Sequence, residues 1–297
     1  MKRIALLLIL ALLAIILPTN FVELSYGLHE IQLTTDPWLQ DRPALIFAPA
    51  YSGLPNRYYF AYQSWEKGEE YGGDIFIEIL SLDWTRIKKV RVTYEPSYQD
   101  SPCLVYYGAY LYVLYISNEM GPYNIFVQKF DANLNFVYKT RVTESPYPED
   151  RPSAVLLMGE YFYVAYQTWL LGENYYGDIC IEVFDSSWHS IKKVMATNDN
   201  FYEDSPSVCY IDEFIYVAYV SSETMHWNIF VKKYDLVLET AMKFQLTNDP
   251  YPHDMPSINT IITETFNGFS LAYQGWPDEA NNGSRSHEIS SIKTVHP

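Results

Sequence analysis

Five aspartates stand at regular intervals along the chain, and each is followed two residues later by proline. They close a recurring Thr-x6-Asp-x-Pro pattern, and neighbouring copies are 50 to 59 residues apart: Asp41, Asp100, Asp150, Asp204 and Asp254. Carboxylates that a repeating fold gathers at one place can do two kinds of chemistry. Several can coordinate a hard cation such as calcium, which takes about six to eight oxygen ligands. A pair can act as acid and base in glycoside hydrolysis.

Aromatic and acidic residues form a second repeated set. Three repeats carry Tyr-Gln-x-Trp, which ends at Trp65, Trp169 and Trp276, and the other two have Glu119 and Glu223 at this place. The tryptophans are candidates for a platform that binds a sugar or a peptide, and packing between repeats is the alternative. The glutamates are solvated loop residues or, with a partner carboxylate, acid/base groups. We predict these five residues as ligand contacts.

The aspartates themselves have an architectural interpretation. An Asp ahead of x-Pro can accept hydrogen bonds from nearby backbone N–H groups and so fix a turn. Every repeat needs that turn, whereas chemistry occurs once in a molecule. We therefore predict no catalytic set and no cofactor. Two alternatives stay open, namely calcium held by the five aspartates and catalysis by Asp41, Asp150 and Glu223.

Each repeat contains four short runs that are typical of β-strands. In the third repeat, two runs rich in Val, Tyr and Phe, 153–157 and 161–166, flank a turn at 158–160. A third run, 178–184, alternates apolar and polar residues, and a fourth covers 192–197. Four antiparallel strands in a repeat of this length describe a blade of a β-propeller.

Five copies of the pattern predict an all-β fold, a five-bladed β-propeller of four-stranded antiparallel blades. The last repeat offers three strands, and residues 30–34 supply a fourth that closes the ring and covers an open edge. The predicted blades are about 36–93, 94–143, 144–197, 198–247, and 248–297 together with 29–35. The alternation of Trp with Glu indicates a duplicated pair of blades plus one more.

Strand order predicts which residues share a face. The Thr-x6-Asp-x-Pro link joins the outer strand of one blade to the inner strand of the next, and the Trp or Glu loop joins the second strand to the third. Antiparallel strands return the chain to the same side at every second connection, so both loops lie on one face. We expect the five aspartates around the mouth of the ring, where pockets usually form.

The first 27 residues predict a secretory signal. Lys2 and Arg3 precede an unbroken apolar run at 4–17, Pro18 ends it, and small residues at 25 and 27 suit cleavage. An uncleaved N-terminal anchor is the alternative. The predicted location is secreted or extracytoplasmic, with the propeller over 28–297. Cys103, Cys180 and Cys209 are expected to be buried, free thiols.

Charge limits the partners. A formal net charge of −16 argues against nucleic acid and anionic membranes, because both require a basic surface. A glycan or an extracellular protein remains as the expected partner, and we expect a monomer. No nucleophilic serine motif, phosphate loop or nucleotide fingerprint occurs.

The repeat resembles those of sialidase-like secreted β-propellers. The resemblance rests on Asp204-Ser205-Pro206-Ser207, 214–219 and 228–235, and extends over about 30–297. Sialidases also carry Asp boxes and three arginines, whereas this chain has no Asp box and only Arg42 and Arg151 beside the aspartates. The chain is also similar to five-bladed glycoside hydrolases of the arabinanase type. These carry an Asp-Pro at an inner strand and a glutamate as general acid.

In this chain, Asp41 with Pro43 and Glu223 match that arabinanase pattern. The resemblance implies the propeller fold and, as one possible activity, polysaccharide hydrolysis. We predict an exported, non-catalytic propeller that binds a glycan or a protein partner on the face of the Asp-x-Pro loops. A polysaccharide-active glycoside hydrolase with its site at the channel mouth is the alternative.

Overall fold

The computed structural model describes residues 32–65, 72–169, 177–239, 241–248, 252–262, 267–275, 288–289 and 293–295. Every regular element within these ranges is a β-strand. No helix within them is long and apolar enough to span a membrane. The predicted signal lies outside the described residues, and so does the start of the predicted closing strand.

Four sheets have the four-stranded antiparallel meander of a propeller blade. The first contains β1 (Gln40–Ala48), β2 (Arg57–Ser64), β3 (Asp74–Leu80) and β4 (Arg86–Arg91). The second contains β5 (Gln99–Tyr107), β6 (Tyr110–Ser117), β7 (Asn124–Asp131) and β8 (Phe136–Arg141). The third contains β9 (Glu149–Leu157), β10 (Tyr161–Thr168), β11 (Asp178–Phe184) and β12 (Ser190–Met195). The fourth contains β13 (Glu203–Ile211), β14 (Phe214–Ser221), β15 (Asn228–Asp235) and β16 (Ala241–Gln245).

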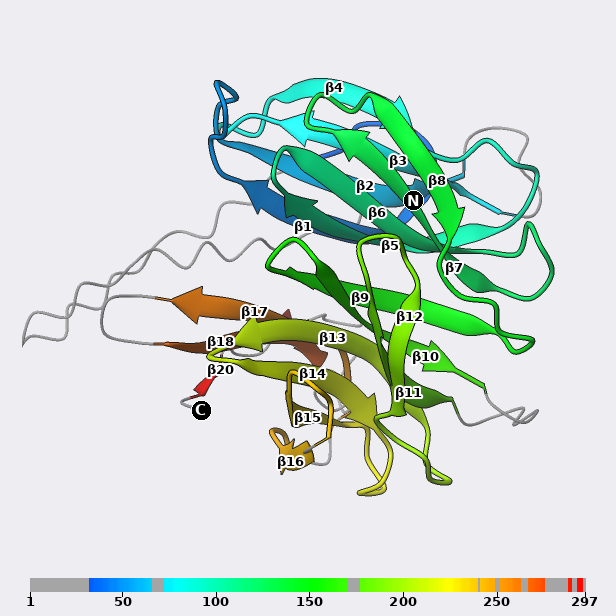
Figure 1. Cartoon of the computed structure of the whole chain (residues 1–297), viewed down its shortest axis with the longest axis vertical. Coiled ribbons are helices and arrows are strands. Elements are labelled where there is room, and N and C mark those ends of the chain that lie inside the picture. Colours follow the sequence, from blue (N-terminus) through cyan, green and yellow to red (C-terminus); the bar gives the residue numbers. More distant parts are fainter. Residues whose placement is uncertain are drawn as a thin grey trace, which may run out of the picture.

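A fifth sheet is described in part. It pairs β17 (His253–Ile262) with β18 (Asn267–Gly275), and the short β19 (Glu288–Ile289) and β20 (Lys293–Val295) both pair with β18. Figure 1 shows the first strand of each sheet toward the middle of the molecule, with β4 and β16 toward the outside. The inner strands pack in sequence, β1 on β5, β5 on β9, β9 on β13 and β13 on β17.

Closure of a five-bladed ring stays a prediction. Among the described residues, no comparable packing joins β17 to β1. Residues 32–35 form no strand. Leu33 packs against the first sheet instead, beside Phe60 and Tyr62.

The hydrophobic cores lie between neighbouring sheets, because strand side chains alternate between two faces. Along β6, Leu111, Val113 and Tyr115 belong to the core shared with the first blade. Their neighbours Tyr112, Leu114 and Ile116 belong to the core shared with the third blade. The central strands are therefore apolar on both faces, as a stack of blades requires.

The threonine of four repeats fastens the outer strand to its neighbour. The Thr197 hydroxyl accepts the Ile179 N–H at 2.8 Å and donates to Asp178 at 3.1 Å. Thr93, Thr143 and Thr247 accept the equivalent N–H bond. The three cysteines are free thiols, as predicted, and burial raises the pKa of Cys103 to about 11.

Candidate functional site

The five aspartates fix one backbone conformation. In each repeat the residue after the aspartate has a φ between 49° and 54°: Arg42, Ser101, Arg151, Ser205 and Met255. A non-glycine residue in this left-handed region is strained. In all five repeats its N–H donates to the aspartate Oδ1 at 2.6 to 2.8 Å, which offsets that cost. The strand bulges there. The predicted backbone role of the aspartates is confirmed.

The same residue also connects one blade to the next. Arg42 lies 3.7 Å from Asp100, and Arg151 lies 2.8 Å from Asp204. From the intervening blade, the Ser101 hydroxyl donates to Asp150 at 3.0 Å. Arginine and serine side chains thus alternate in linking the aspartates of successive blades. We call the five aspartates the Asp ring: Asp41, Asp100, Asp150, Asp204 and Asp254.

The arginines and aspartates of the Asp ring affect one another's pKa values. Burial raises the pKa of Asp100, although Arg42 and the Tyr98 hydroxyl lower it. Burial lowers the pKa of Arg42, but Asp100, Asp150 and Asp41 together bring it above its usual value. The described part of the chain contains no group of three or more His, Cys, Asp or Glu placed to hold a metal ion. Arg42 and Arg151 each pair with a ring aspartate of the next blade.

A cavity of about 480 Å³ opens between the second and third blades. We call it the main pocket, and its lining combines ring residues, four aromatic residues and Glu149: Arg42, Tyr98, Asp100, Ile116, Tyr123, Tyr147, Pro148, Glu149, Asp150 and Trp169. Tyr98 donates its hydroxyl to Asp100 at 2.8 Å and meets the Tyr123 ring edge to face at 5.4 Å. Aromatic faces beside polar groups form a surface that suits a sugar ring.

Glu149 differs from the other carboxylates of the main pocket. Its backbone N–H donates to the Tyr123 carbonyl at 2.9 Å, and its Oε2 accepts the Thr143 hydroxyl. The second oxygen, Oε1, is buried and has no hydrogen-bond partner. Burial raises the pKa of Glu149 to about 7. A carboxyl in this state can hold a proton near neutral pH, as a general acid must.

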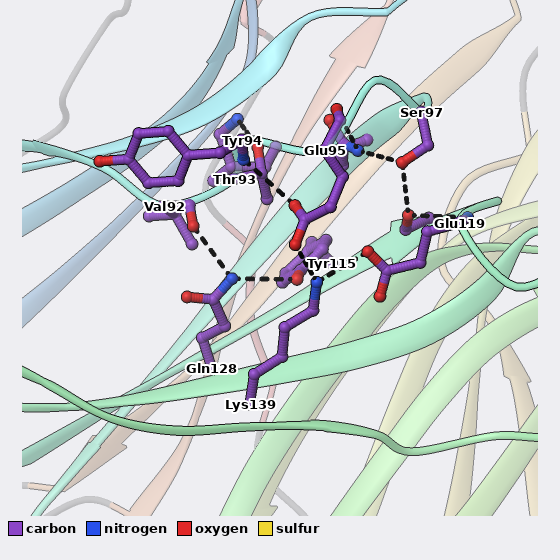
Figure 2. Close-up of polar contacts among 12 residues, drawn as sticks. Val92, Thr93, Tyr94, Glu95, Ser97, Tyr115, Glu119, Gln128 and Lys139 are labelled. Carbon is purple, nitrogen blue, oxygen red and sulfur yellow. Dashed lines mark hydrogen bonds and ion pairs between the residues drawn. The ribbon is translucent and has the colours of Figure 1, made fainter.

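A larger side pocket of about 620 Å³ adjoins the main pocket and shares Tyr98 and Tyr123 with it. Its lining also includes Glu95, Ser97 and Glu119. Figure 2 shows Lys139 between Glu95 and Glu119, with Nζ–oxygen distances of 2.6 and 2.7 Å. Burial lowers the pKa of Lys139, but the hydrogen bonds that it donates to both carboxylates raise its pKa overall. Glu119 therefore lies at a pocket, as an ion-paired group.

The remaining predicted residues are separated. Trp169 lines the main pocket. Trp65 is half-buried in the first blade, where its backbone N–H donates to the Leu39 carbonyl at 3.1 Å. This bond, and the equivalent one from Trp169 to Pro148, confirm that the two kinds of loop share a face. Trp276 lies outside the described residues.

The three residues of the catalytic alternative differ in their contacts, and two of them, Asp41 and Asp150, both raise the pKa of Arg42. Glu223 pairs with Lys243, as Glu119 does with Lys139. Asp41 is exposed, and Asp150 accepts the Ser101 hydroxyl. In the part of the chain that the structure describes, no hydrogen bond or ion pair links Asp41, Asp150 and Glu223.

Four polar or aromatic lining residues were not anticipated from the sequence: Tyr98, Tyr123, Tyr147 and Glu149. Two of them left a visible signal. Tyr98 recurs as Tyr202, two residues before the aspartate in the second and fourth repeats only. Glu149 stands directly before Asp150, at a position that differs between repeats while the aspartate does not.

No protein-family model and no curated protein matches the sequence. Solved structures do match. An α-L-arabinofuranosidase from Fusarium graminearum has a TM-score of 0.62 and 12% identity, over 90% of this chain and 80% of that one. An α-L-arabinanase from Penicillium chrysogenum, complexed with arabinobiose, has a TM-score of 0.61 and 11% identity, over 84% and 80%.

A thermostable family-43 glycoside hydrolase matches with a TM-score of 0.54 and 11% identity, over 87% of this chain and 93% of that one. At these identities the likeness shows the fold. The chain therefore shares the β-propeller fold of arabinanase-type glycoside hydrolases, and the predicted resemblance is confirmed at that level.

Proposed function

We propose that this protein is an exported, non-catalytic propeller that binds a neutral glycan in the main pocket. The observation that carries the proposal is the lining, where Tyr98, Tyr123, Tyr147 and Trp169 surround polar ring residues. Aromatic side chains present flat apolar faces with little conformational entropy to lose. The carboxylates of Asp100, Asp150 and Glu149, and the acidic chain as a whole, favour an uncharged sugar over an anionic one.

Engagement of the ring carboxylates favours binding over catalysis. Asp100 accepts the Ser101 N–H at 2.6 Å and the Tyr98 hydroxyl, and pairs with Arg42. Asp150 accepts the Arg151 N–H at 2.7 Å and the Ser101 hydroxyl. A carboxylate held in this way orients hydroxyl groups of a ligand well, but it is less free to activate water. The proposal includes closure of the five blades into a ring.

Glycoside hydrolysis is the second candidate, because Glu149 favours it. A buried glutamate whose pKa is raised to about 7 suits protonation of a leaving group, and Asp150 adjoins it in the same pocket. The fold neighbours, among them an α-L-arabinofuranosidase and an α-L-arabinanase, agree with a glycan ligand under both candidates.

Calorimetric titration of the purified protein with arabinohexaose, xylohexaose and cellohexaose tests the proposal. We expect one of them to bind, and Trp169→Ala to weaken its affinity at least about 10-fold. Tyr161→Ala is the matched control, because Tyr161 begins β10 and Trp169 follows its other end. Equal affinity of Trp169→Ala and the native protein would overturn the main pocket as the site.

Chromatography of the sugar after long incubation separates the two candidates. Intact hexaose supports a binder. Shorter products that disappear with Glu149→Gln would replace the binder with the hydrolase.

A further inference from the structure

The contacts that build the main pocket recur two blades further along the chain. Tyr98 donates its hydroxyl to Asp100 at 2.8 Å, and Tyr202 donates to Asp204 at the same distance. The recurrence is geometric as well as sequential, because the hydroxyl meets Oδ2 of the aspartate in both blades.

The links across the blade junctions recur as well. Ser101 donates its hydroxyl to Asp150 of the third blade at 3.0 Å. Ser205 donates to Asp254 of the fifth sheet at 3.2 Å. Arg151 takes the place of Arg42, paired with Asp204 as Arg42 is with Asp100.

The outer wall of the main pocket, formed by Tyr123 and Glu149, is also repeated. Trp227 and His253 take the places of these two residues. The Glu149 N–H donates to the Tyr123 carbonyl at 2.9 Å, and the His253 N–H donates to the Trp227 carbonyl at 2.8 Å. Trp227 therefore stands where Tyr123 stands in the main pocket, and it stacks on Tyr202 with 5.5 Å between ring centroids and 21° between planes. The Trp227 side chain is 43% exposed, so a large aromatic surface faces solvent there.

The propeller fold by itself does not require this wall. Every repeat keeps the aspartate and its backbone bond, but the position of Tyr98 and Tyr202 is Leu39 in the first repeat and Pro148 in the third. The tyrosine, its aromatic neighbour and the serine occur together only in the second and fourth blades. A feature that the fold needs would appear in all the blades.

We propose that the junction of the fourth blade with the fifth sheet is a second binding site for the same neutral glycan, built around Tyr202, Asp204, Trp227, His253 and Asp254. This inference rests on the proposed function of the main pocket. The second site has one carboxylate fewer, because His253 replaces Glu149, and its indole offers a larger stacking surface than Tyr123. Two sites on one face give a polysaccharide chain two points of attachment, and hence avidity.

Native mass spectrometry of the protein with arabinohexaose, xylohexaose and cellohexaose tests this inference. We expect two molecules of one sugar per chain, and one molecule with either Trp227→Ala or Tyr123→Ala. The double variant should bind none. Thermal unfolding of each variant shows that it is folded, and Tyr202→Phe offers a milder change of the second site, with an expected affinity loss of about 3-fold or more there.

The outcomes separate the two proposals. A single bound sugar that is lost with Tyr123→Ala and kept with Trp227→Ala overturns the second site and leaves the proposed function intact. A single bound sugar with the opposite response moves the function to the second site. No bound sugar with any of the three hexaoses overturns both.

Discussion

The ring aspartate and the residue directly before it differ in how much they vary between repeats. The aspartate is the same in all five repeats and makes the same bond to the next N–H. The preceding position changes from repeat to repeat: Gln40, Gln99, Glu149, Glu203 and His253. The constant aspartate therefore serves the fold, whereas the variable position before it can take on a separate role in each blade.

The backbone of the preceding position is still structural. Gln63 donates its amide to the Gln99 carbonyl at 2.5 Å, and Gln167 donates to the Glu203 carbonyl at 2.6 Å. Only the side chain at this position varies between repeats. In the third and fourth blades it is a buried glutamate with one oxygen that has no hydrogen-bond partner. Departures from symmetry therefore locate the candidate chemistry better than the symmetric residues do.

The largest expected effect comes from breaking the Asp ring where it is buried. Asp204→Ala removes the acceptor of the Tyr202 hydroxyl and the Ser205 N–H, and the partner of Arg151. We expect the free energy of unfolding to fall by about 3 kcal/mol, because Arg151 loses its closest carboxylate and Ser205 keeps its strained φ. Urea unfolding followed by tryptophan fluorescence measures the loss.

Asp41→Ala is the control within the same ring. Asp41 is exposed, so its replacement should lower the free energy of unfolding by less than about 1 kcal/mol. Equal losses for the two variants would show that burial does not set the contribution of a ring aspartate.

The next effect concerns the preceding position and depends on pH. Burial raises the pKa of Glu203 to about 8, from an ordinary value of 4.5. The folded state therefore holds a proton that the unfolded state releases, and this stabilisation is complete below pH 4.5 and is lost as pH rises toward 8. Glu203→Gln removes the ionisation, so the variant should be more stable than the native protein by about 1–2 kcal/mol at pH 8. Urea midpoints at pH 5 and pH 8.5 measure the difference.

The second blade supplies the reverse experiment. Gln99 occupies the same position and donates its amide to Ser97 at 2.6 Å. Gln99→Glu should add a loss of stability with rising pH that the native second blade does not have. A native protein whose stability does not change relative to Glu203→Gln between the two pH values would contradict the assignment.

The repeat makes much of the fold predictable from sequence. Runs such as 161–166 alternate between two apolar faces, and a strand buried on both faces needs a sheet on each side. The spacing of Thr197 from Ile179, 18 residues, recurs because one strand pairing recurs. The backbone role of Asp204 followed from its presence in every repeat. Closure by residues 30–34 stays a prediction, because the start of that segment lies outside the described ranges and 32–35 form no strand.

The main pocket was less predictable, because its lining comes from three blades. Tyr98, Tyr147 and Trp169 lie on different loops, and their approach depends on the angle between sheets rather than on any local pattern. The state of Glu149 depends on its burial beside Thr143 of the second blade, which no spacing reveals. Trp169 was predicted because a repeated Tyr-Gln-x-Trp stood out, yet Trp65, with the same motif, does not line this pocket.

The smallest expected effect tests whether equivalent hydrogen bonds in the second and fourth blades contribute equally to the free energy of unfolding. Tyr98→Phe and Tyr202→Phe each remove one hydroxyl that donates to a buried ring aspartate at 2.8 Å. Each should lower the free energy of unfolding by about 1–1.5 kcal/mol, and the double variant by the sum, because the two bonds share no partner. Tyr161→Phe, on an exposed ring, is the control and should cost less than about 0.5 kcal/mol. Unequal losses at Tyr98 and Tyr202, measured by urea unfolding, would mean that Asp100 and Asp204 depend on their arginines to different degrees, in line with the Arg42 and Arg151 distances of 3.7 and 2.8 Å. The two blades would then share their hydrogen-bond geometry but not the contribution of these bonds to the free energy of unfolding.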